Sequence, residues 1–189
     1  MEQAESMAAR DAADGDARIR LATAVRELTE VLTEMGQPEE ALRVTDHSLR
    51  RLGEMKPSAK VSIEMLRLEV GAAGALLRLK RFEEARQRIA SAERQLAAAG
   101  GSQAVEPGSE AFVVRKMKAE WEAATGHPER ASQLYRALVE AMDSSGKAHV
   151  DVDLRHAVNY SGVYRDWARV DPHGPASERR LALWRQWGV

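Results

Sequence analysis

Apolar residues recur along most of the chain at intervals of three and four, which is the pattern of helices with one buried face. The clearest example lies within residues 76–96, LLRLKRFEEARQRIASAERQL. One stripe there consists of residues spaced 3, 4, 3 and 4 apart: Phe82, Ala85, Ile89, Ala92 and Leu96. Glu83 and Glu84 fall in the first turn of that helix, where unpaired backbone N–H groups favour negative charge. The pattern therefore predicts that one helix ends just before Phe82 and another begins there, with the small Ala85 at a close helix contact.

The same pattern predicts eight helices in all. Their approximate ranges are 17–35, 38–55, 59–79, 82–99, 109–125, 128–144, 150–170 and 175–187. In the first helix, the buried face is expected to consist of Leu21, Val25, Leu28, Leu32 and Met35. Residues 1–16 have two interpretations. They are either the end of a preceding repeat, with a return loop at Asp11–Gly15 and an N-cap at Asp16, or a frayed tail.

A corner sequence recurs at a nearly constant interval. The first and third corners read GQPEEA at 36–41 and GHPERA at 126–131, the second reads KRFEEA at 80–85, and a weaker fourth reads HGPA at 173–176. Their alanines are 44, 46 and 45 residues apart. A glycine can end a helix in the left-handed conformation, and a proline two residues later can begin the next helix. A fixed period of this size predicts stacked helical hairpins.

These corners resemble those of the tetratricopeptide repeat (TPR). The matching positions are Gly36 and Ala41, Phe82 and Ala85, and Gly126 and Ala131, with Tyr135 at the aromatic position of a second helix. Lys80 replaces the glycine of the second corner, the period exceeds the usual one of roughly 34 residues, and the first-helix Trp, Leu-Gly and Tyr positions are mostly not met. The resemblance covers about residues 17–171 and implies a divergent array with longer helices or loops.

Three shorter segments resemble the C-terminal repeat region of large bacterial serine/threonine protein kinases. They are DARIRLA at 16–22, QPEEAL at 37–42 and RRLALWRQW at 179–187. The catalytic motifs of kinases, a Gly-rich loop after a strand, His-Arg-Asp and Asp-Phe-Gly, are absent from the sequence. The resemblance therefore implies an appended binding region without phosphoryl-transfer chemistry of its own.

Composition narrows the function classes. The 28 basic and 29 acidic residues nearly cancel, which argues against nucleic acid as an obligate partner. The chain has no cysteine, which excludes disulfides and zinc–cysteine sites. No apolar run approaches the roughly 18 residues of a membrane span, and no signal peptide opens the sequence. We expect a cytoplasmic protein, or an extracytoplasmic one if the chain belongs to a membrane-anchored kinase.

Few groups of residues in the sequence have the types and spacings that are typical of a catalytic site or a metal site. One cluster of potential metal ligands occurs within eight residues: His149, Asp151, Asp153 and His156. On a helix these side chains point in different directions, and the aspartates are explained by a helix start, so we expect no metal. No serine has the flanking glycines of a nucleophile elbow. We therefore expect no catalytic residues and no cofactor.

The TPR resemblance implies that the first helix of each hairpin lines a concave binding surface. The charged residues expected on it are Arg26, Glu30, Arg67, Arg78, Lys116, Glu120 and Arg165. Less polar positions on the same helices are Thr33, Val70, Gly74, Leu77, Val113 and Ser161. TPR domains that clamp a peptide carboxylate use several asparagines, whereas Asn159 is the single asparagine of this chain. A longer partner held by mixed polar and apolar contacts is therefore expected.

The sequence thus predicts an all-α fold, a right-handed array of about four antiparallel hairpins. The hairpins are expected at about 17–55, 59–99, 109–144 and 150–187, within one domain over 17–189. The predicted function is a non-catalytic scaffold or regulatory module that binds a protein or peptide in a bacterial signalling protein. Trp184 and Trp187 are expected to pack on the preceding helix, or else to form an end that pairs with a second copy. A homo-oligomerisation module and a helical enzyme remain the alternatives.

Overall fold

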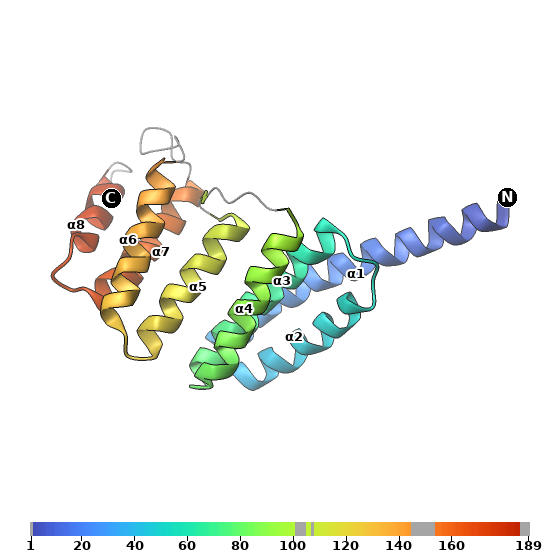
Figure 1. The fold of residues 1–189 in the computed structure, drawn as a ribbon, viewed down its shortest axis with the longest axis horizontal. Coiled ribbons are helices and arrows are strands. Elements are labelled where there is room, and N and C mark those ends of the chain that lie inside the picture. Colours follow the sequence, from blue (N-terminus) through green and yellow to red (C-terminus); the bar gives the residue numbers. More distant parts are fainter. Residues whose placement is uncertain (1, 101–104, 107, 145–153, 186–189) are drawn as a thin grey trace. The chain divides into compact units, whose positions relative to one another are not determined.

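The computed structural model describes residues 2–100, 105–106, 108–144 and 154–185, and α-helices dominate these segments (Figure 1). The helices are α1 Glu2–Glu34, α2 Pro38–Gly53, α3 Ala59–Arg78, α4 Phe82–Ala98, α5 Glu110–Ala124, α6 Pro128–Ser144, α7 Leu154–Val170 and α8 Ala176–Arg185. The described segments contain no strand, so the predicted all-α class is confirmed. In the same segments, no helix is long and apolar enough to cross a membrane.

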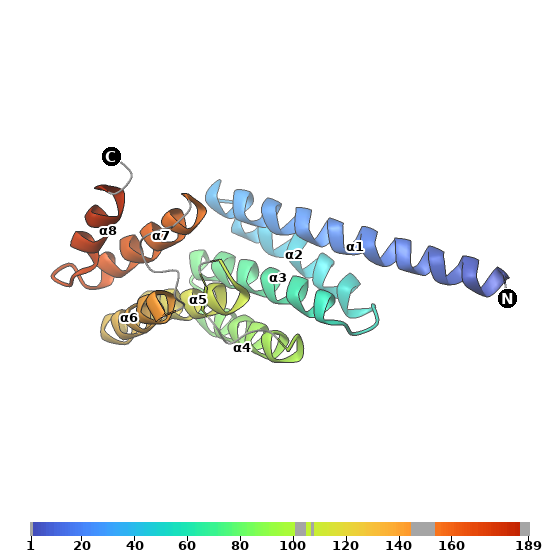
Figure 2. The same cartoon turned by 90° about the horizontal axis from the view of Figure 1, so that it is seen from above.

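The chain divides into two compact units, Met1–Gly100 and Gly101–Val189. In the first unit, α3 contacts each of α1, α2 and α4, and Figure 2 shows it between α4 and the other two helices. In the second unit, α7 contacts each of α5, α6 and α8. The central position of α3 follows from its sequence, because it has buried residues on most sides, including Leu66, Leu68, Ala72 and Leu76. Each unit is therefore built around one central helix.

Three corners share one backbone geometry. The second residue after each helix end is left-handed: Gly36, Lys80 and Gly126 have φ angles of 77°, 58° and 84°. In each corner the amide of this residue donates to the carbonyl oxygen three residues earlier at 3.1–3.2 Å, and the next amide donates to the carbonyl oxygen five residues earlier at 2.8–3.0 Å. This pair of bonds is the Schellman motif, which satisfies the last carbonyls of a helix. The corners found in the sequence are therefore a structural repeat as well.

The alanines of the corners are all fully buried. Relative exposure is 0% for Ala41, Ala85, Ala131 and Ala176. The fourth corner nevertheless differs, because Gly174 is not left-handed and a Cβ there would lie 2.5 Å from Oδ2 of Asp171. A small residue is thus buried at all four positions, whereas the backbone geometry recurs in three.

Lys80 should be the weak point of the second corner, because an L-residue in the left-handed conformation is strained and glycine is not. We expect Lys80→Gly to raise the free energy of unfolding by about 0.5–1 kcal/mol, net of the extra entropy of glycine in the unfolded chain. Urea denaturation followed by circular dichroism measures this.

The control is Gly36→Ala, which should be destabilising. A Cβ at Gly36 would meet nothing within 4 Å, so its cost reports backbone conformation alone. An unchanged or lower stability of Lys80→Gly would show that the lysine is not strained in this corner.

The loop and N-cap predicted near the start of the chain are wrong. No loop occurs at Asp11–Gly15, and Asp16 is not an N-cap, because α1 runs without interruption from Glu2 to Glu34. The physical reason is that this stretch is rich in alanine and contains no proline. Good helix formers on both sides outweigh the cost of about 1 kcal/mol for Gly15 within a helix.

The buried face predicted for α1 is also partly wrong. Leu21, Leu28 and Met35 are exposed by 46%, 44% and 66%. The side of α1 that faces the core carries Ala22 and Thr29 instead. Apolar residues occur on two sides of this helix, and periodicity cannot say which side packs. The side with small residues faces the core, where the Oγ1 atoms of Thr29 and Thr45 lie 2.7 Å apart between α1 and α2.

The core of the second unit is aromatic. Trp167 and Tyr135 are each 1% exposed, and Tyr160 and Tyr164 are 2% exposed. The Trp167 indole N–H donates to Oγ of Ser132 at 2.9 Å, which ties α7 to α6. Large rings at these positions allow helices of about 17 residues to bury enough apolar surface for a stable unit.

Candidate functional site

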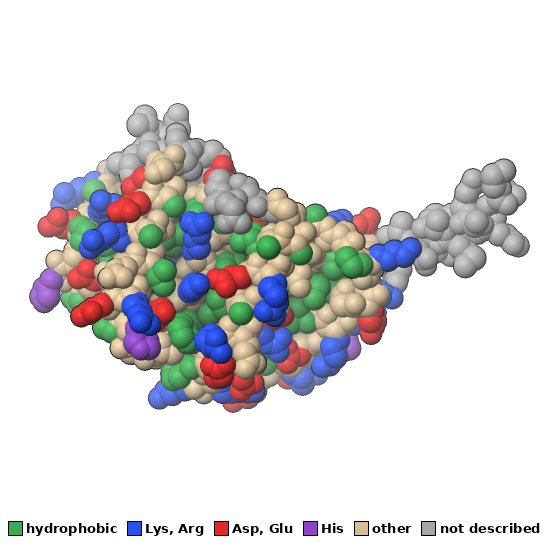
Figure 3. Space-filling model, viewed as in Figure 1, with side chains coloured by type: hydrophobic (Ala, Val, Ile, Leu, Met, Phe, Trp, Pro, Cys, Tyr) green, Lys and Arg blue, Asp and Glu red, His purple; other side chains and the backbone are tan. Residues whose placement is uncertain are grey.

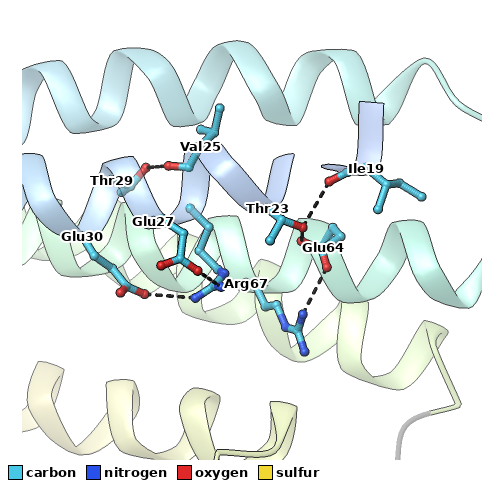
Figure 4. Close-up of polar contacts among 9 residues, drawn as sticks. Ile19, Thr23, Val25, Glu27, Thr29, Glu30, Glu64 and Arg67 are labelled. Atoms are coloured by element: carbon cyan, nitrogen blue, oxygen red, sulfur yellow. Dashed lines mark hydrogen bonds and ion pairs between the residues drawn. The ribbon is translucent and has the colours of Figure 1, made fainter. Parts of the chain in front are cut away.

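The residues predicted for binding in the first unit are exposed or half-buried and mostly paired within the unit. Arg26 on α1 pairs with Glu27 and, at 3.4 Å, with Glu30. Arg67 on α3 donates to Oε1 of Glu64 at 3.1 Å (Figure 4). Arg78, in the last turn of α3, is exposed. Arg26 and Arg67 are thus already held by carboxylates of their own helices.

Glu64 has a structural role that the sequence did not indicate. Its side chain is 8% exposed, and its Oε2 accepts from the hydroxyl of Thr23 on α1 at 3.3 Å (Figure 4). With Arg67 on its other oxygen, this buried carboxylate is compensated. The contact joins α1 to α3, so Arg67 contributes to the fold of the unit besides presenting a charge at its surface.

In the second unit, the predicted residues Lys116, Glu120 and Arg165 meet around Asp166. The Asp166 side chain is 10% exposed, and it accepts from Nζ of Lys116 at 3.1 Å and from Nε of Arg165 at 2.9 Å. Arg169 lies 3.4 Å away, and Lys116 also pairs with Glu120. Three cations thus meet two carboxylates across α5 and α7. The ion pair between Lys116 and Asp166 joins α5 to α7, and the two arginines remain at the surface.

The electrostatics of this cluster follow from its geometry. Burial alone would raise the pKa of the Asp166 carboxyl, but hydrogen bonds and charge from Arg165 and Lys116 outweigh it, so the pKa lies below its usual value. Burial would lower the pKa of Lys116, and Glu120 and Asp166 reverse this to a net rise. Burial, aided by the charges of Glu120 and Asp166, raises the pKa of the Tyr135 hydroxyl well above its usual value. Each group is therefore held in its ordinary charge state at neutral pH.

An open hollow of about 710 Å³ lies between α7 and α8. Its lining comes from two helix faces of the second unit: Arg165, Ala168, Ser177, Arg180, Leu181 and Trp184. Leu181 is 57% exposed, so the floor presents an apolar side chain to the solvent. Arg165 donates to Asp166 through Nε and Nη2, and Arg180 donates to Ser161 through Nε, so each guanidinium keeps further N–H donors. The hollow therefore offers an apolar floor beside two cations.

Ser161 is placed differently from the prediction. It is 6% exposed and accepts from the Trp184 indole N–H at 2.9 Å and from Nε of Arg180 at 3.1 Å. The reason is that α8 folds onto α7 and covers this side of it. The prediction that Trp184 packs on the preceding helix is confirmed, because this hydrogen bond joins the two helices. Trp187 lies outside the described residues.

Sequence reasoning missed Asp166 and the lining of α8. The partner of Asp166 on α5 is 50 residues away, and no spacing rule connects the two positions. A signal did exist for α8, where Ser177, Arg180, Leu181 and Trp184 follow the spacing of one helix face. The potential metal ligands His149, Asp151 and Asp153 lie outside the described residues.

Surface charge on the visible face is mixed. Figure 3 shows basic and acidic side chains interspersed there, without a patch of one sign. Comparisons with protein-family models, with curated proteins and with solved structures find no match to this chain.

Proposed function

We propose that this chain is a non-catalytic protein-binding module of the TPR-like helical-repeat class. It would serve as a scaffold or regulatory region of a bacterial signalling protein, in the manner of the repeat region of a serine/threonine kinase. The observation that carries the proposal is the recurrence of one corner, with the same Schellman hydrogen bonds and a fully buried alanine, at intervals of 44 and 46 residues. Helix pairs repeated in this way present side chains from successive helices as binding surfaces.

Within this function, we assign the binding surface of the second unit to the hollow between α7 and α8. Its partner would be an extended segment that places an apolar side chain over Leu181 and Trp184 and a carboxylate near the guanidinium groups of Arg165 and Arg180. Arginine suits such a contact, because its planar fork of N–H donors binds a carboxylate in two places. An apolar anchor beside a charged rim is the usual composition of a peptide site.

A peptide-display selection tests this proposal. Random peptides are selected on the intact chain and then measured on two charge-reversed variants. We expect enrichment of peptides with Asp or Glu next to an aromatic or aliphatic residue. Arg165→Glu combined with Arg180→Glu should weaken their binding on the order of tenfold or more, and added salt should weaken it as well.

The matched control is Arg130→Glu combined with Arg136→Glu, which reverses two exposed arginines of α6. This variant should bind the selected peptides as the wild type does. Binding that survives reversal at the hollow would place the site elsewhere on the chain. A selection that enriches no sequence would contradict the peptide-binding function.

A further inference from the structure

A second apolar stripe runs along α1 on the side that does not face the core. Its members follow one another at spacings of 4, 3, 4, 3 and 4, and all are exposed: Ala17, Leu21, Ala24, Leu28, Val31 and Met35, the last just beyond the helix end. This spacing is the heptad pattern of a coiled-coil seam. Exposed apolar side chains are normal singly, but a continuous stripe of this kind marks an interaction surface.

The helix that carries the stripe is also unusually long for its unit. It has 33 residues, against 16 in its hairpin partner α2. Figure 1 shows its N-terminal part extending beyond α2 and α3. The side chains of the stripe are exposed, so a second helix could lie along them without displacing any helix of the first unit.

We propose that this second helix is the α1 of another copy of the chain, packed antiparallel. That arrangement forms three kinds of side-chain layer. In two of them a larger side chain packs against an alanine. Leu28 packs against Ala24 of the second copy, Met35 against Ala17, and Leu21 against Val31. A parallel pair would place Ala24 against Ala24 and Leu28 against Leu28, which leaves a gap in one layer and crowds the next.

The charges beside the stripe favour the same register. Arg20, Glu27 and Glu34 are exposed along one flank of the stripe, at intervals of seven. The antiparallel register places Arg20 opposite Glu34 of the second copy, twice by symmetry. At the centre of the pair, Glu27 of one copy lies opposite Glu27 of the other, but each carboxylate is already paired with Arg26 of its own chain. In a parallel pair, Arg20 and Glu27 would lie opposite Val25 and Leu32, so their charges would have no match.

Sedimentation of the full chain over roughly 1–100 µM tests whether the dimer exists. We expect a concentration-dependent dimer for the wild type and a monomer for Leu28→Glu combined with Val31→Glu, because buried carboxylates would oppose the seam. The control is Val158→Glu, at an apolar residue of α7 that is 55% exposed, and it should remain dimeric. A wild type that is monomeric throughout, or a dimer that survives the double substitution, would overturn the proposal.

Exchanging the charges of Arg20 and Glu34 tests the register of the proposed pair. Arg20→Glu should raise the dimer dissociation constant by about three- to tenfold, and adding Glu34→Arg should restore it, because the pair is rebuilt with its charges exchanged.

The chain has no cysteine, so introduced thiols report directly on neighbours. A mixture of Ala24→Cys and Leu28→Cys chains should form a disulfide between unlike chains faster than either variant forms one with itself. Preferential disulfides between like chains would indicate a parallel pair and overturn the antiparallel arrangement.

Discussion

Replacing Arg88 with alanine is expected to lower the free energy of unfolding by roughly 2–4 kcal/mol, the largest effect of a single substitution that we predict for this chain. Arg88 on α4 donates to Oε2 of Glu69 at 3.0 Å and to Oδ1 of Asp46 at 2.6 Å, so it joins α4 to both α3 and α2. The Glu69 side chain is 9% exposed. Without Arg88, this buried carboxylate would keep the hydrogen bond from the Ser91 hydroxyl but would lose the cation that compensates its charge.

The expected loss in the free energy of unfolding lies somewhat below that for a fully buried ion pair, because the Arg88 side chain is 30% exposed. Burial would lower the pKa of Arg88, and the charges of Glu69 and Asp46 reverse this to a net rise, which agrees with a guanidinium held between two carboxylates. Urea denaturation followed by circular dichroism gives the stability. Tryptophan emission does not report on this unit, because all four tryptophans lie beyond residue 120.

Two variants separate charge pairing from loss of the side chain. Arg86→Ala removes an exposed arginine that pairs with Glu83 in the same helix, and it should change stability little. Arg88→Met combined with Glu69→Met should recover much of the loss, because both charges are replaced by apolar side chains of similar size. If the double variant is as unstable as Arg88→Ala, or if Arg86→Ala costs as much, the stability does not depend on the pairing of Glu69.

The second large effect is expected at Asp166. Asp166→Asn removes the charge that Lys116 and Arg165 share, while keeping a side chain of the same shape. We expect a loss of about 1.5–3 kcal/mol at pH 7, the range of hydrogen bonds to charged groups. Tryptophan emission measures it, because Trp167 is the next residue and is buried.

The stability lost in Asp166→Asn should depend on pH in a defined direction. The pKa of Asp166 is lowered in the folded chain, so its charge contributes stability above the unfolded pKa of about 3.9, and this contribution disappears as the pH falls through the folded pKa. The difference between wild type and Asp166→Asn should therefore be full at pH 7 and should shrink steadily below pH ~4.

The control is Glu83→Gln, at an exposed carboxyl whose pKa is lowered by a hydrogen bond from Arg86 on the surface of α4. It should show little difference from wild type at either pH, because exposed pairs are screened by solvent. A difference for Asp166→Asn that is the same at pH 3 and pH 7 would mean that the carboxylate charge does not stabilise the α5–α7 contact.

How much of the site could be predicted depends on the distance between its parts in the sequence. Arg165 and Lys116 were found, because they occupy positions on helices that the pattern located. Asp166, which joins them, was missed because its partner comes from another helix. The same holds for Arg88, which looks like one more charged residue of a polar face and instead bridges three helices. Long-range pairs between charged side chains leave no periodic trace in a sequence.

By itself, the sequence determined the local structure of this protein. Helix periodicity, the prolines and glycines of the corners and the small alanines act over a few residues, and they placed the helix ends at Pro38, Phe82 and Pro128 correctly. Periodicity also located the buried stripe of α4 at Ala85, Ile89 and Ala92, whereas tertiary structure decided which side of α1 is buried. On α1, two apolar stripes were available, and the one with Ala22 and Thr29 packs against α2 and α3 because small side chains allow close approach. The other stripe of α1 stays exposed, because periodicity cannot decide which of two apolar sides of one helix packs against its neighbours.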